Sequence, residues 1–126
     1  MQPGQPEVSA PWAAERLGLA DLHALSRGDG VTVAVIDSGL NADGHPQLAG
    51  VRVAPGANVI DGADPADTRD CSGHGTAVAG IIAAQPIAGS GFVGVAPGAT
   101  VLPIKQSATD ADGTAAGLAR GIRAAL

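Results

Sequence analysis

The stretch Val31–Gly39, which reads Val-Thr-Val-Ala-Val-Ile-Asp-Ser-Gly, decides the fold class of this chain. Its first six residues are apolar or β-branched, a pattern typical of a parallel strand buried on both faces. The following Asp-Ser-Gly ends the strand as a turn. Asp37 is therefore expected at the carboxyl end of a parallel sheet, where open α/β folds place their ligands and their chemistry.

Outward from that strand, a second stretch, Ser72–Ile82, predicts a buried helix from about His74 to Ala84. A strand over Thr100–Lys105 and a helix over Gly113–Leu126 follow it, and Ala57–Ile60 predicts a weak strand. Two short helical segments are expected before residue 28. This order of elements predicts an α/β fold: a partial, truncated parallel sheet with right-handed crossovers and helices on both faces.

Composition excludes several classes of protein. The chain has 126 residues, a net charge of −5 and no cluster of Lys or Arg, which argues against binding to nucleic acid or to an anionic membrane. The longest apolar run, residues 31–36, is too short to span a bilayer, and no signal segment opens the chain. Cys71 is the only cysteine, so no internal disulfide can form.

Asp37 and His74 are the candidate acid–base pair. Each has a structural alternative: Asp37 as a strand-ending turn residue, and His74 as a packed residue at a helix end. A helix N-terminus disfavours the imidazolium, and Gly73 and Gly75 are expected to clear space beside the ring. A neutral imidazole can act as a general base, and a carboxylate on its other nitrogen would fix the tautomer. We therefore predict a carboxylate–imidazole contact of about 2.6–3.5 Å.

Four blocks of sequence carry a family resemblance. In order along the chain, they resemble the first half of the domain of the subtilisin-like serine proteases, the subtilases: Val33–Gly39, His45–Leu48, Gly73–Ile81 and Gly94–Ala99. The resemblance implies that Asp37 is the acid and His74 the base of an Asp-His-Ser triad that hydrolyses peptide bonds. It further implies that residues 29–126 form the N-terminal part of a peptidase domain, preceded by an extension over residues 1–28.

Three details are most similar to the mycosins, the membrane-anchored subtilases of type VII secretion: the Pro11–Ala13 lead-in, the Asp70–His74 segment and the Gly91–Ala99 segment. That resemblance implies polypeptide substrates, the type VII secretion machinery as a partner, and no cofactor or metal. It places the full-length protein at the extracellular face of the cell membrane or in the medium, through targeting and anchoring segments that this chain lacks. In mycosins a cysteine at the position of Cys71 is commonly bridged to the N-terminal extension, and no such partner is present here.

The nucleophile of the triad is missing. Subtilases carry it in a late Gly-Thr-Ser-x-Ala segment, after an oxyanion-hole Asn, and neither motif occurs here. Of the six serines, Ser38 and Ser72 adjoin the candidate pair, but we interpret them as turn and helix-capping residues. Two hypotheses remain: a serine endopeptidase whose serine lies outside this chain, and a truncated or degenerate domain that serves as a non-catalytic structural or interaction module. In either case residues 1–126 alone are expected to be inactive.

Three further patterns are weaker. Gly89–Gly94 matches the dinucleotide-binding fingerprint, but it follows a helix and runs into Pro97, so the pattern lacks the required context. His45 could ligate a metal with Asp43, and a turn position is the simpler interpretation. Acidic residues at every third position suggest calcium, but the glycine and glutamate of an EF-hand are absent, so we expect a solvated acidic loop: Asp61, Asp64, Asp67 and Asp70.

Overall fold

The computed structural model describes residues 8–109 and 112–126, so residues 1–7 of the expected extension lie outside the described residues. Eight helices and strands occur in this part of the chain: α1 Trp12–Leu17, α2 Leu19–Leu25, β1 Thr32–Asp37, β2 Arg52–Val53, β3 Ala57–Asn58, α3 His74–Ala83, β4 Thr100–Lys105 and α4 Ala115–Ala124. The expected elements are present: the strand expected over Thr100–Lys105 coincides with β4, and the others differ at one or both ends by one to a few residues. The two-residue strand β2 was not expected.

The sheet is parallel throughout, with β4 in its centre. On one side β4 pairs with β1, in a register that sets Asp37 beside Lys105. On the other side it pairs with β2 through its first residues and with β3 through its last. The predicted α/β class is confirmed. Since all strands point the same way, Asp37 lies at the carboxyl edge of the sheet.

Helix α3 covers one face of the sheet. Its small residues Ala79 and Ala83 lie against Val35 of β1 and Val101 of β4, and Ala79, Ala83 and Val101 are fully buried. Small side chains let the helix axis approach the sheet closely, so the interior there is filled mainly by the β-branched strand residues.

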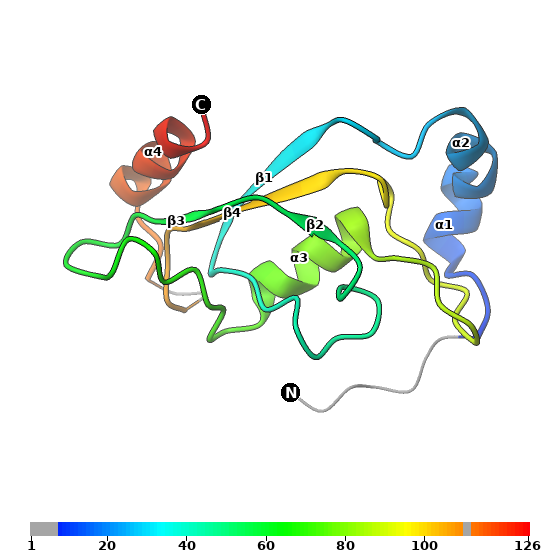
Figure 1. Cartoon of the computed structure of the whole chain (residues 1–126), viewed down its shortest axis with the longest axis horizontal. Coiled ribbons are helices and arrows are strands. Elements are labelled where there is room, and N and C mark those ends of the chain that lie inside the picture. The colour runs from blue at the N-terminus through cyan, green and yellow to red at the C-terminus, as the bar shows by residue number, and fades with distance from the viewer. Residues whose placement is uncertain (1–7, 110–111) are drawn as a thin grey trace.

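Helix α4 lies on the opposite face, as Figure 1 shows, so helices flank the sheet on both sides. Gly121 of α4 leaves room for the methyl groups of Ile36 and Ile104. The prediction that β1 is buried on both faces is wrong, however: of its residues only Val35 is buried, and Ala34 is exposed. The helix meets the carboxyl-terminal half of β1 and leaves the first half of that face open.

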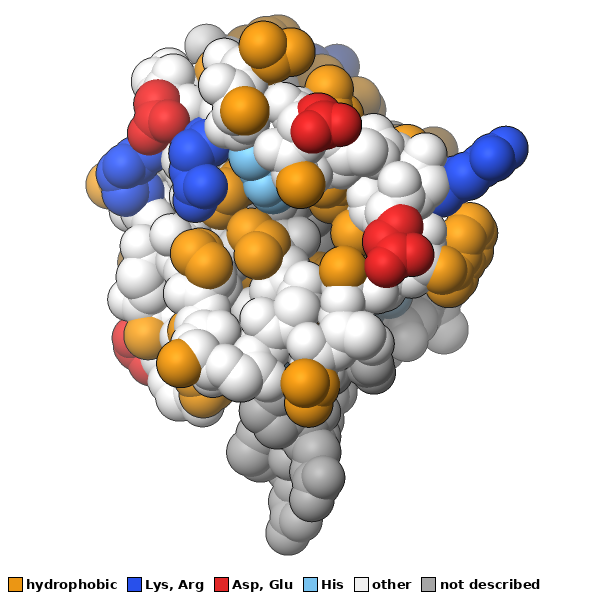
Figure 2. All heavy atoms as spheres, turned by 90° about the vertical axis from the view of Figure 1, so that its right-hand side faces the viewer, with side chains coloured by type: hydrophobic (Ala, Val, Ile, Leu, Met, Phe, Trp, Pro, Cys, Tyr) orange, Lys and Arg blue, Asp and Glu red, His pale blue; other side chains and the backbone are white. Residues whose placement is uncertain are grey.

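Helices α1 and α2 stand beside the amino ends of β1 and β4. Several of their apolar side chains are exposed, Trp12 by 79% and Leu25 by 85%. Figure 2, which faces this end of the molecule, shows its hydrophobic side chains in small groups scattered among backbone, other side chains and a few charged ones. Among the described residues, none of the helices has the length and apolar character needed to cross a bilayer.

Candidate active site

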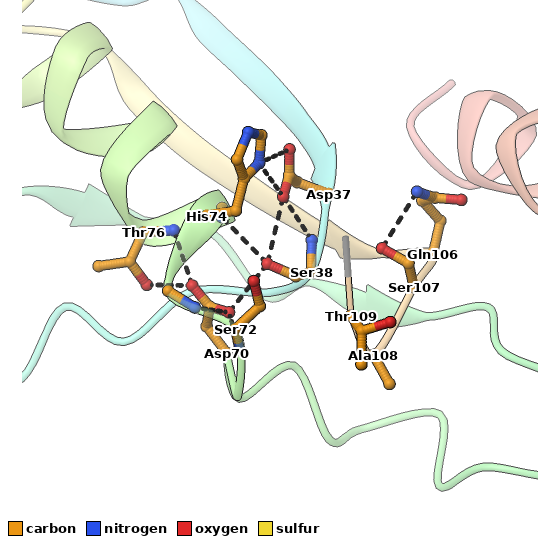
Figure 3. Close-up of polar contacts among 12 residues, drawn as sticks. Asp37, Ser38, Asp70, Ser72, His74, Thr76, Gln106, Ser107, Ala108 and Thr109 are labelled. Atoms are coloured by element: carbon orange, nitrogen blue, oxygen red, sulfur yellow. Dashed lines mark hydrogen bonds and ion pairs between the residues drawn. The ribbon is translucent and has the colours of Figure 1, made fainter. Parts of the chain in front are cut away.

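Asp37 and His74 meet at the carboxyl edge of the sheet. Nδ1 of His74 lies 2.8 Å from Oδ1 and 2.9 Å from Oδ2 of Asp37, within the predicted range (Figure 3). With its proton on Nδ1, the ring donates to the carboxylate, and Nε2 carries the lone pair that can accept a proton. The His74 side chain is 58% exposed and that of Asp37 is 19% exposed. The imidazole is thus accessible to a substrate, while the carboxylate behind it is mostly shielded.

Two glycines at the start of α3 allow this approach. Gly73, the N-cap residue, has a φ of 91°, a conformation that side-chain-bearing residues rarely adopt. A Cβ on Gly75 would lie 2.2 Å from the carbonyl oxygen of Gly39 and 3.2 Å from Cβ of Asp37. The lack of a side chain at Gly75 thus lets the first turn of α3 pack directly on the end of β1.

Substitution of Gly75 by Ala is expected to lower the free energy of unfolding by at least about 2 kcal/mol, because the new methyl group meets backbone that cannot move away. Gly80 in the same helix is the matched control, since nothing lies within 4 Å of its added Cβ. Gly80→Ala should stabilise the chain by about 0.5–1 kcal/mol through helix propensity. Urea denaturation of both variants measures the difference. Equal effects would contradict the close packing of Gly75.

A second carboxylate, Asp70, organises the backbone around the pair. Its side chain accepts hydrogen bonds from the Ser38 hydroxyl at 2.9 Å, from the Thr76 hydroxyl at 2.6 Å, and from three backbone amides of residues 72, 73 and 76. The Ser38 oxygen in turn accepts from the amide of Gly75 at 3.0 Å. These bonds join the end of β1 to the start of α3 (Figure 3).

Two predictions are corrected by this arrangement. Asp70 is not part of a solvated acidic loop: it is only 6% exposed, because the amides at the start of α3 surround it. The Ser72 position is not the helix cap, which is Gly73, and the first-turn amides of Gly75 and Thr76 are bonded to Ser38 and Asp70 instead. The spacing Asp-x-x-x-His was the signal in the sequence that could have identified Asp70.

Burial opposes the ionisation of Asp70, but the hydrogen bonds from Thr76, Gly73 and Ser38 outweigh it and lower its pKa to about 2. An unfolded Asp has a pKa of about 3.9. Ionised Asp70 therefore stabilises the fold fully above about pH 4, and this contribution is lost as the pH falls toward 2.

Ser38 can also be judged as a nucleophile. It is 1% exposed, and its hydroxyl is engaged by Asp70 and by the amide of Gly75. No substrate can reach it in this conformation, which agrees with its interpretation as a turn residue. It serves as a link between β1 and α3.

The remaining sequence patterns lie apart from the pair. The Gly89–Gly94 stretch lies in the connection between α3 and β4, without a helix after it. Asp61 and Asp64 are exposed, and Asp67 pairs with Arg69 at 2.8 Å. Within residues 8–109 and 112–126, no group of three or more His, Cys, Asp or Glu side chains is arranged to hold a metal ion. Cys71 is exposed with a free thiol.

A cavity of ≈ 500 Å³ lies on the outer side of α3, between that helix and the chain after β1. Its lining includes Asn41, His45, Leu48, Ala77, Ile81 and Phe92, and neither Asp37 nor His74 contributes to it. Gly73 and Thr76 also line the cavity, so it reaches the start of α3, where His74 lies.

Comparison with known proteins agrees with the fold. The model of the subtilase family (Peptidase_S8) matches residues 28–126, and the chain therefore belongs to the subtilases, a family of serine proteases. Among its relatives, Mycosin-1 of Mycobacterium tuberculosis is 43% identical over 105 residues, which are 83% of this chain and 22% of that protein. Subtilisin BL of Lederbergia lenta is 37% identical, over 90% of this chain and 40% of the relative.

Solved structures of MycP proteases also match the fold of this chain. MycP1 with its N-terminal propeptide removed superposes with a TM-score of 0.76 at 38% identity, covering 93% of this chain and 35% of that one. The MycP3 protease from the type VII (ESX-3) secretion system gives a TM-score of 0.73 at 35% identity, and the match covers 99% of this chain and 35% of the MycP3 chain. The chain thus corresponds to about a fifth of the length of the mycosins it matches and to about a third of the chains in these structures.

Proposed function

We propose that this chain supplies the acid, Asp37, and the base, His74, of a mycosin-like serine endopeptidase. The observation that supports the proposal is the contact of 2.8 Å between Nδ1 of His74 and the Asp37 carboxylate at the carboxyl edge of the sheet. A serine outside residues 1–126 attacks the scissile carbonyl. Nε2 of His74 takes its proton, and Asp37 holds the ring in the tautomer that leaves Nε2 unprotonated. Residues 29–126 then form the N-terminal part of the peptidase domain, with residues 1–28 as an extension.

The biological setting is part of the same proposal. MycP1 is described as a serine protease that is an essential component of the type VII (ESX-1) secretion system, and other relatives occur in the ESX-5 inner membrane complex and its periplasmic assembly. By analogy, the whole protein cleaves polypeptides at the outer side of the membrane, in association with such a secretion complex. A non-catalytic module of the same complex is the alternative.

The test first asks whether the complete reading frame encodes a Gly-Thr-Ser-x-Ala segment, and it then compares residues 1–126 with a version extended through that segment. The extended protein should hydrolyse peptides and react with a fluorophosphonate serine probe, and the shorter chain should do neither, because it lacks the nucleophile. An extended protein that folds but does not react supports the non-catalytic module. Labelling of residues 1–126 at any of their own serines would contradict the assignment and indicate another hydrolase.

A further inference from the structure

The hydroxyl group of Ser38 stands between two carboxylates. Its oxygen lies 2.9 Å from Oδ1 of Asp70 and 3.2 Å from Oδ1 of Asp37 (Figure 3). It has one proton, so it can donate to only one of them at a time. The oxygen already accepts from the amide of Gly75, which restricts the rotation of the hydroxyl.

The distances favour donation to Asp70. Oδ1 of Asp37 is already occupied by the amide of Ser38 at 2.7 Å and by Nδ1 of His74 at 2.8 Å. A third donor on that oxygen would stabilise the carboxylate further and weaken its attraction for a protonated imidazole. Oδ1 of Asp70 likewise accepts from two amides, those of Ser72 and Gly73. It lies nearer to the hydroxyl oxygen, at 2.9 Å against 3.2 Å, so the hydroxyl proton has its shorter acceptor in Asp70.

The other charged groups near the pair are occupied. Lys105, beside Asp37 in the sheet register, is buried and donates one of its three Nζ protons to the backbone oxygen of Arg69. The Arg69 guanidinium turns outward to Asp67, at 2.8 and 2.9 Å. Asp70 is thus the charged group that is joined to the acid–base pair through a hydrogen-bonded side chain.

We infer that Asp70 is a positioning residue that holds the hydroxyl proton of Ser38 away from Asp37 and so keeps the Asp37 carboxylate basic toward His74. The inference rests on the proposed function, because it concerns the proton affinity of the proposed general base. The buried charge of Asp70 acts in the same direction, since a negative charge favours the imidazolium.

The test is the pKa of the His74 imidazole, measured by NMR in residues 1–126 with labelled histidine. Asp70→Asn should lower it by about 0.5–1 unit, because both the charge and the strong acceptor for Ser38 are lost. Asp67→Asn is the matched control: it removes an acidic group of the same loop that pairs with Arg69, and it should leave the His74 pKa unchanged. His23 and His45 are internal references in every sample.

Ser38→Ala completes a double-mutant cycle. Alone it should change the His74 pKa little, because the lost proton was directed to Asp70. In the Asp70→Asn background, where the hydroxyl is expected to turn to Asp37, the same change should raise the His74 pKa. A rise of equal size in both backgrounds overturns the inference, and so does an Asp70→Asn shift no larger than that of Asp67→Asn.

If circular dichroism shows that Asp70→Asn does not fold, Thr76→Val replaces it. That variant removes the hydroxyl at 2.6 Å from Oδ2 of Asp70 and makes the carboxylate a stronger acceptor for Ser38. It should raise the His74 pKa slightly, and a fall would contradict the inference. If His74 of the wild-type chain has the pKa of an unfolded histidine, its contact with Asp37 does not act on the imidazole, and this result would overturn the inference. None of these outcomes depends on labelling of the extended protein, so the two proposals can fail separately.

Discussion

Replacement of His74 by Ala in the extended, serine-containing protein is expected to lower kcat by about 10⁶-fold, the loss found when the triad histidine is removed from subtilisin, a member of the same family. The reason is that the imidazole is the group placed to take the proton of the attacking serine, with its Nδ1 already held by Asp37 at 2.8 Å. Without it, only binding and oxyanion stabilisation remain.

Steady-state hydrolysis of a chromogenic peptide measures the loss. His23→Ala is the control, because His23 lies in α2 and its ring contacts the backbone oxygen of Val95 instead of the pair. It should leave kcat unchanged. A His74→Ala protein that keeps more than about a hundredth of the wild-type kcat would exclude His74 as the base.

The second large effect is expected for Asp37→Asn, a change of nearly equal volume that removes the charge. We expect a loss of about 10⁴-fold in kcat with little change in stability. An Asn amide in this position can donate to Nδ1, which moves the ring proton to Nε2 and leaves no lone pair for the serine proton. The distances of 2.8 and 2.9 Å put Nδ1 within reach of either terminal atom of the new side chain.

Activity is again the measurement, with thermal unfolding to show that the fold is retained. Asp61→Asn serves as the control, because Asp61 is exposed and pairs with Arg120 at 3.2 Å on the surface. Wild-type activity in Asp37→Asn would assign the carboxylate a purely structural role.

The sequence predicted those parts of the structure that depend on a local pattern. Val31–Ile36 and Thr100–Lys105 are apolar and β-branched runs, and they form the two long strands. The contact between Asp37 and His74 could be anticipated for a related reason: a strand end and a helix start meet at the same edge of a parallel sheet. The structure bears out this distance, and the catalytic roles of the two residues await the experiments above.

Features that depend on tertiary contacts could not be predicted. Arg52–Val53 is too short to show any periodicity, and it forms a strand because it lies beside the first residues of β4. Asp70 was interpreted from its exposed acidic neighbours, while its environment is set by amides and hydroxyls from the start of α3 and the end of β1. The open face of β1 likewise depends on how far α4 reaches along the strand, which no local pattern records.

Hydrogen bonds join the two ends of the segment that connects Asp37 to His74. The amide of Leu40 donates to the Thr68 oxygen at 2.9 Å, and the Asn41 side chain bonds both the amide and the carbonyl of Asp70. Changes in the length of the exposed turn near Gly62 should therefore leave the positions of Asp37 and His74 unchanged. Each doubling of the length of a flexible loop costs only about 0.6 kcal/mol of stability. A foreign peptide or an affinity tag can be inserted in this turn, because the hydrogen bonds of Leu40 and Asn41 hold the chain between the turn and His74 in place.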